Sequence, residues 1–102
     1  MEATNEEIRQ IIVQALIDSA PDQALAEDLI KNDPALFQKN TMRMVFETIG
    51  MESLGWLWFG TLLEEQLPAG AIGEMEVFFI TNSDKYLDEL IEQLKSNAIS
   101  NE

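Results

Sequence analysis

Apolar residues near the start of the chain recur at the spacing of an amphipathic helix. The positions that share one helical face are Ile8, Ile11, Ile12, Ala15 and Leu16. Thr4 followed by Glu7 is typical of a capping box, in which two side chains satisfy the first free N–H groups of a helix. The pattern therefore predicts a helix over residues 5–18.

A second, shorter helix is predicted over residues 21–31. Ser19 is a suitable N-cap, and Pro21 is a residue type favoured in the first helical turn. The side of this helix that faces inward would carry Leu25, Leu29 and Ile30. The first two helices together form a helical hairpin in this interpretation.

The end of the chain shows the clearest helical pattern. Thr81, Asn82, Ser83 and Asp84 form a start signal. The apolar positions that follow it keep an i, i+3, i+4, i+7, i+11 spacing: Leu87, Leu90, Ile91, Leu94 and Ala98. We expect a C-terminal helix here, with its acidic residues facing solvent.

The middle of the chain fits two kinds of element. Within residues 41–49, a helix would place four apolar residues on one face: Met42, Val45, Phe46 and Ile49. A strand would instead place Met42, Met44 and Phe46 on one face and Arg43, Val45 and Glu47 on the other. Residues 54–63 fit either a helix that is apolar all round or a strand that contains two glycines. Neither segment decides between the alternatives by itself.

Residues 74–81 favour the strand interpretation. This segment is rich in β-branched and aromatic residues and follows the turn-forming residues 68–70. A buried strand needs partners for its backbone groups, and 41–49 and 54–63 are the candidates. The expected fold is therefore one α+β domain over residues 1–102, with an N-terminal helical hairpin, a three-stranded antiparallel β-meander and a C-terminal helix. The alternative is a mostly α-helical bundle.

Composition and charge narrow the range of partners. Hydrophobic residues make up 46% of the 102 positions, which is enough to expect a folded core, and 19 acidic residues against 6 basic ones give a net charge of −13. This charge repels phosphate backbones and anionic lipid surfaces and attracts basic protein surfaces. The acidic start and the lack of a long apolar run lead us to expect a cytoplasmic protein without a membrane segment.

The chain lacks the residues on which most catalytic sites depend. It contains neither histidine nor cysteine, so the commonest general base, zinc ligand and nucleophile arrangements are missing. No phosphate-binding loop or calcium loop is present. We therefore expect no enzyme, no cofactor and no metal site.

The segment around two tryptophans is the best candidate for a working surface. As a strand, residues 54–63 would place Trp56 and Trp58 on one face, which either docks a partner or belongs to the core. No basic residue lies near them, so direct nucleic-acid binding is not expected. The candidate partner-binding residues are these tryptophans and the nearby glutamates: Trp56, Trp58, Glu64, Glu65, Glu74 and Glu76.

Two functional hypotheses follow. The first is a non-catalytic interaction module of the inhibitor, immunity, adaptor or secretion-chaperone type, which binds a basic protein surface through acids of the second half. One concrete form is a phage-type inhibitor that imitates the charge of nucleic acid. The alternative is a structural subunit that forms a homo-oligomer, such as a homodimer, through an aromatic sheet face.

Overall fold

The computed structural model describes residues 4–67 and 70–100, without the side chains of Ser53 and residues 98–100, so part of the expected turn at 68–70 lies outside it. Seven α-helices cover the described part of the chain: α1 (Asn5–Ser19), α2 (Gln23–Asn32), α3 (Leu36–Lys39), α4 (Met42–Thr48), α5 (Ser53–Gln66), α6 (Met75–Asn82) and α7 (Leu87–Ser100). No strand occurs in these residues. The predicted α+β fold with its β-meander is therefore wrong, and the mostly helical alternative is confirmed.

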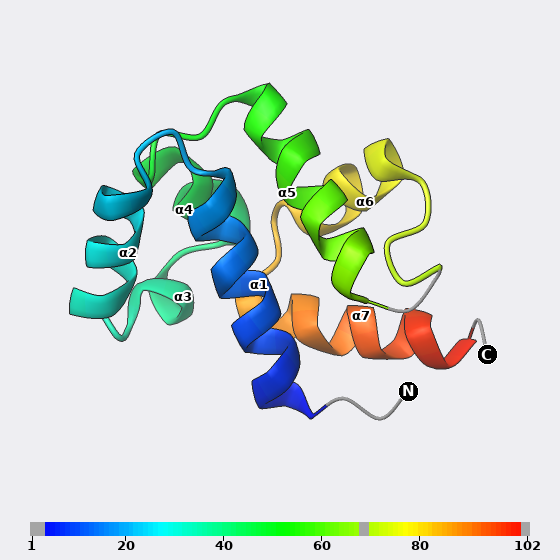
Figure 1. The fold of residues 1–102 in the computed structure, drawn as a ribbon. Coiled ribbons are helices and arrows are strands. Elements are labelled where there is room, and N and C mark those ends of the chain that lie inside the picture. The colour runs from blue at the N-terminus through cyan, green and yellow to red at the C-terminus, as the bar shows by residue number, and fades with distance from the viewer. Residues whose placement is uncertain (1–3, 68–69, 101–102) are drawn as a thin grey trace.

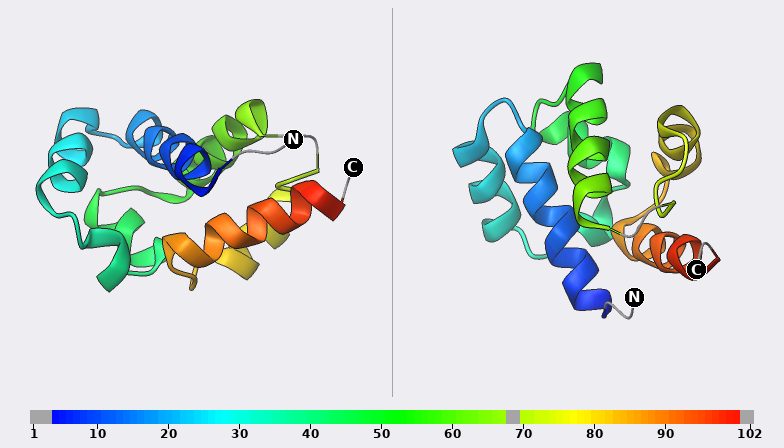
Figure 2. Two further views of the ribbon diagram at one scale, coloured as in Figure 1. Left: turned by 90° about the horizontal axis from the view of Figure 1, so that it is seen from below. Right: turned by 45° about the vertical axis from the view of Figure 1, so that its right-hand side comes forward.

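The helices lie in two layers, which the left view of Figure 2 shows most clearly. One layer contains α2, α1 and α5, with α1 in the middle, and the other contains α4, α7 and α6. Figure 1 shows α6 beside α5 at the right of the molecule. None of the described helices is both long and apolar enough to cross a membrane.

The structure confirms the predicted first and last helices, but some of the residues predicted to mark helix ends have other roles. In α1, the backbone N–H of Glu7 donates to Thr4 Oγ1 at 3.1 Å, as the capping box predicted. Ser19 remains in the last turn of α1, so α2 is capped by Asp22 instead. The predicted start signal of the last helix is also wrong in part, because Thr81 and Asn82 end α6 and α7 begins only at Leu87.

Residues 41–49, one of the predicted strands, form α4. Thr41 caps its start, with its Oγ1 accepting from the backbone N–H of Met44 at 3.5 Å. At its end, Gly50 adopts a positive φ of 75°, and the backbone N–H of Met51 donates to the carbonyl of Phe46 at 2.9 Å. This is a Schellman motif, so Gly50 terminates a helix and does not make a turn between strands.

Residues 54–63, the second predicted strand, lie within α5. The residues of α5 and just after it that face the rest of the molecule repeat at helical spacing: Trp56, Phe59, Gly60, Leu63 and Leu67. A β-carbon at Gly60 would overlap the sulfur of Met75 from α6, so the flexible Met75 side chain would have to move. This glycine therefore allows the start of α6 to lie close against α5.

Residues 74–81, the segment that favoured a sheet, form most of α6. Its inward face consists of Met75, Phe78, Phe79 and Asn82, at positions i, i+3, i+4 and i+7 of a helix. A helix satisfies its backbone hydrogen bonds internally, so this segment needs no partner strand. Packing of that face against the other helices overrides the β-propensity of its residues.

The core lies between the two layers. Several large side chains from both layers are almost completely buried there: Ile12 and Leu16 of α1, Phe46 of α4, and Leu90 and Leu94 of α7. Leu25 of α2, which was expected to face inward, is 49% exposed. Burial of the inner helix faces, by the hydrophobic effect, is what stabilises this arrangement.

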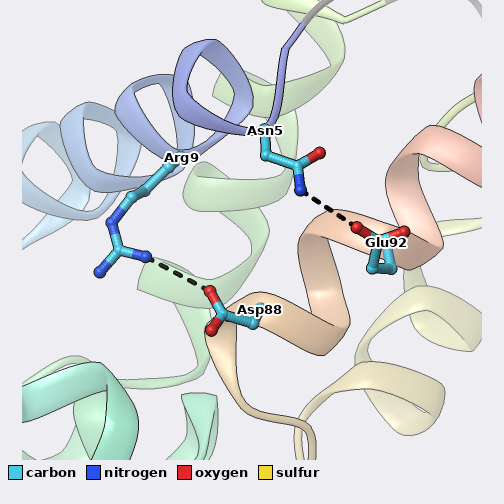
Figure 3. Close-up of polar contacts among 4 residues, drawn as sticks. All are labelled: Asn5, Arg9, Asp88 and Glu92. Carbon is cyan, nitrogen blue, oxygen red and sulfur yellow. Dashed lines mark hydrogen bonds and ion pairs between the residues drawn. The ribbon is translucent and has the colours of Figure 1, made fainter.

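Polar contacts join the outer edges of α1 and α7, as Figure 3 shows. Arg9 and Asp88 form an ion pair at 3.3 Å, and Asn5 Nδ2 donates to Glu92 Oε1 at 3.2 Å. Asn5, Asp88 and Glu92 are exposed and Arg9 is partly buried, so water weakens these interactions. They fix the crossing of the first and last helices less strongly than the apolar contacts beneath them.

The first turn of α4 is bound to the loop between α6 and α7. The backbone N–H of Met42 donates to the carbonyl of Lys85, and that of Arg43 donates to the carbonyl of Ser83, both at 2.9 Å. Donors at the start of a helix have no partner within it, and here residues some forty positions later accept them. This contact places Arg43 beside the end of α6.

Candidate functional site

A chain of aromatic rings runs from α4 through α5 to α6. The rings of Phe46 and Trp56 meet edge to face with centroids 3.7 Å apart, and the rings of Trp56 and Phe79 do so at 5.1 Å. Phe46 is fully buried, whereas Trp56 and Phe79 are partly exposed. The aromatic chain therefore begins in the core and reaches the surface between α5 and α6.

A hollow of about 520 Å³ opens at that surface end. We call it the apolar hollow, and it is lined by Arg43, Trp56, Leu57, Phe79, Ile80 and Ser83. Four of these side chains are apolar or aromatic, and the two polar ones lie where α4 meets the end of α6. Its size and mostly apolar lining are typical of sites that receive a ligand or partner side chains.

Arg43 is held in place at the polar edge of this hollow. Its Nη2 donates to Ser83 Oγ at 3.1 Å, and its Nε lies 3.6 Å from Asp84 Oδ1. The side chain is 56% exposed, so the ion pair is weak in water, but it offsets part of the positive charge locally.

A second hollow, of about 500 Å³, continues from the first over α4 and the start of α5. We call it the acidic hollow, and it is lined by Arg43, Glu47, Met51, Glu52, Leu54 and Trp56. Arg43 and Trp56 line both hollows. The combined site is therefore apolar at one end and carries two carboxylates, Glu47 and Glu52, at the other.

Large apolar side chains project around the hollows. On α5, Leu54 is 80% exposed and is followed by Leu57 and Trp58 at the i+3 and i+4 positions, which lie on the same helical face. On α6, Ile80 is 79% exposed, and Val77 precedes it by three residues. We call these five residues the α5–α6 apolar face.

The structure separates the two predicted tryptophans. Residues two positions apart point about 200° apart around a helix, so Trp56 and Trp58 do not share a face as a strand would require. Trp56 lies partly buried in the hollows, and Trp58 is 51% exposed on the α5–α6 apolar face. One therefore contributes to the core and the other to the surface.

The four predicted glutamates all lie exposed at helix ends. Glu64 and Glu65 are in the last turn of α5, Glu74 is the N-cap residue of α6, and Glu76 is in the first turn of α6. None of them lines either hollow among the described residues. Glu76 is on the same short helix as Val77 and Ile80, so it belongs to the rim of the apolar face.

Sequence reasoning missed four residues that shape the site. They line the hollows but come from three segments: Arg43 and Glu47 from α4, Glu52 from the N-cap of α5, and Phe79 from α6. The helical alternative for residues 41–49 did hold a signal, because it places Arg43 and Glu47 one turn apart on the same face. Phe79 joins them only once residues 74–81 are recognised as a helix.

The site offers contact surface and charge more than reactive groups. Within the described residues, no three acidic side chains converge as metal ligands would. A scan of protein-family models and searches of curated proteins and of solved structures found no match to this chain. The geometry of this surface is therefore the basis for the proposed function.

Proposed function

We propose that this protein is a non-catalytic structural subunit that associates with a second copy of itself through the α5–α6 apolar face. The predicted sheet that was to carry such a face does not exist, and two helices carry it instead. The observation that carries the proposal is where the exposed apolar residues lie. Of the eight large hydrophobic side chains that are exposed in the described residues, five lie on α5 and α6.

The size of this face suits a small interface. Leu57 is 46% and Val77 54% exposed, so with the three fractions given above the five residues offer roughly 600 Å² of surface per copy, against about 800 Å² per partner in an interface of standard size. The open apolar hollow beside Leu57 and Ile80 adds to this area. Exposed apolar surface of this extent is at the upper end of what a typical monomer carries, about 300–600 Å², and patches of that size often mark an interaction site.

Symmetry makes a second copy a suitable occupant. A two-fold interface brings the same patch of both copies together, so an uncharged apolar centre meets an equally uncharged one. The charges lie at the rim, where Glu76 and Asp84 outnumber Arg43. Because each copy carries a net charge of −13, the rims repel each other, and salt should tighten the association by screening that repulsion.

Sedimentation velocity over a concentration series tests the proposal. We expect the mass to rise from 11.5 kDa toward twice that value with concentration, and at lower concentrations in 500 mM than in 50 mM sodium chloride. Ile80→Asp should weaken self-association by at least about ten-fold, since a carboxylate would be desolvated at the centre of the interface. The chain should keep its fold, because Ile80 is 79% exposed.

Leu25→Asp is the matched control, since Leu25 is 49% exposed but lies on α2. This variant should self-associate like the unmodified chain. The proposal fails if the chain stays monomeric up to about millimolar concentration, where even a weak interface is populated. It also fails if the two aspartate variants lose association equally.

A further inference from the structure

We propose that the apolar and acidic hollows together form a docking site for a basic amphipathic helix of another protein, which competes with the second copy of this chain. Binding of the helix to the hollows does not depend on self-association, whereas its competition with a second copy rests on the proposed function. It rests on the chemistry of the two hollows, which differ in character but share Arg43 and Trp56.

The apolar hollow provides the place for the apolar side chains of such a helix. Trp56 and Phe79 form its walls and remain partly exposed, with Leu57 and Ile80 at its margin. Docking of an apolar helix face into a groove of this kind is a recurring mode of peptide recognition, with anchors at i, i+3 or i+4. Its volume of about 520 Å³ accommodates more than one such side chain.

The acidic hollow provides the charge that selects a basic helix. The carboxylates of Glu47 and Glu52 make no ion pair within the described part of the chain, so both are free to pair with a lysine or arginine. Arg43 is partly offset by Asp84 at 3.6 Å. The net charge of −13 further attracts a basic partner from a distance.

The two occupants should exclude each other, because both need Leu57 and Ile80. Their response to salt has opposite signs. A basic helix pairs opposite charges, so salt weakens its binding, whereas a second copy brings like charges together, so salt strengthens that association. A partner that carries such a helix would therefore convert the self-associated form into a heterologous complex.

A synthetic helix of leucine and lysine, with its leucines at i, i+3, i+4 and i+7, is the probe. It contains no tryptophan, so the emission of Trp56 and Trp58 reports its binding to the full chain, at a protein concentration where sedimentation shows a monomer. We expect saturable one-to-one binding that weakens about ten-fold between 50 and 500 mM salt. The same peptide with glutamate in place of lysine should not bind.

Charge-matched variants locate the binding. Glu47→Gln/Glu52→Gln and Glu27→Gln/Asp28→Asn each change the net charge from −13 to −11, but the second pair is exposed on α2. The first variant should bind the lysine peptide about five-fold more weakly, and the second less than two-fold more weakly. Equal weakening would overturn the inference, because it would mean attraction to overall charge alone.

Competition completes the test. Excess lysine peptide should lower the dimer fraction in sedimentation, and binding that leaves the dimer intact would place the peptide elsewhere and overturn the inference. Failure of the proposed function appears as a monomer without peptide. Failure of this inference appears as tryptophan emission that the lysine peptide does not change.

Discussion

Substituting Phe46 with leucine tests whether the aromatic contacts beneath the hollows stabilise the fold. Phe46 is 1% exposed, and its ring meets those of Trp56 and Phe59 edge to face, with centroids 3.7 and 5.0 Å apart. Leucine keeps an apolar side chain at this position but removes both ring contacts. The substitution therefore separates the geometry of the rings from the burial of apolar surface.

The expected loss of stability has two parts. Replacement of one buried apolar side chain by another of different shape costs about 1 kcal/mol. Each of the two edge-to-face contacts adds about 0.5–1.5 kcal/mol, so the total loss for Phe46→Leu is about 2–4 kcal/mol. That is a large share of the roughly 5–15 kcal/mol that stabilises a typical domain. Urea denaturation followed by circular dichroism measures the difference.

Phe37→Leu serves as the control for the same chemical change. Phe37 is 6% exposed in α3, and its ring lies 5.9 Å from the guanidinium of Arg9. We expect this variant to lose about 1 kcal/mol. If the two leucine variants are equally stable, the edge-to-face contacts contribute nothing and the reasoning about the aromatic chain is refuted.

Three further predictions concern helix ends and the crossing of the terminal helices. Gly50→Ala should lower the free energy of unfolding by about 1–2 kcal/mol, since alanine resists the positive φ of 75° at this position; a thermal melt that does not shift would contradict it. Glu65→Lys should raise the melting temperature in low salt and much less in 1 M salt, because the negative charge of Glu65 is unfavourable at the negative end of the α5 dipole and a lysine there is favourable. The control is Glu27→Lys, which makes the same charge change in the middle of α2, away from the helix ends. A double-mutant cycle of Arg9→Ala and Asp88→Ala should give a coupling energy of less than about 1 kcal/mol, and a larger value would mean that this exposed pair is stronger than its geometry indicates.

The terminal helices could be predicted because their sequences carry both a period and an end signal. In α1, the apolar period and the Thr4 cap agree, and the structure contains both. In α7, the apolar period places Leu87, Leu90 and Leu94 in the core. A long segment with a clear helical period is not compatible with a strand, so its secondary structure can be predicted.

The middle of the chain misled sequence reasoning because α4 and α6 are short and the longer α5 is apolar on more than one side. In α6, a helix face of Met75, Phe78, Phe79 and Asn82 was present, but the β-branched and aromatic residues of the segment favoured a strand. The packing of Met75 against Gly60 is a tertiary contact, which no local pattern reveals. The hollows depend on these helices, so the residues that line them could not be assembled beforehand.

The attachment of α4 to the loop after α6 also bears on how the chain folds during synthesis. The N–H groups of Met42 and Arg43 are accepted by residues 85 and 83, so these two donors have only water as a partner until the ribosome has made about forty more residues. At about 5–20 residues per second, that interval lasts several seconds. During it, the core also lacks Leu87, Leu90 and Leu94 of α7, so apolar surface stays exposed and the nascent chain is prone to aggregation until they are made.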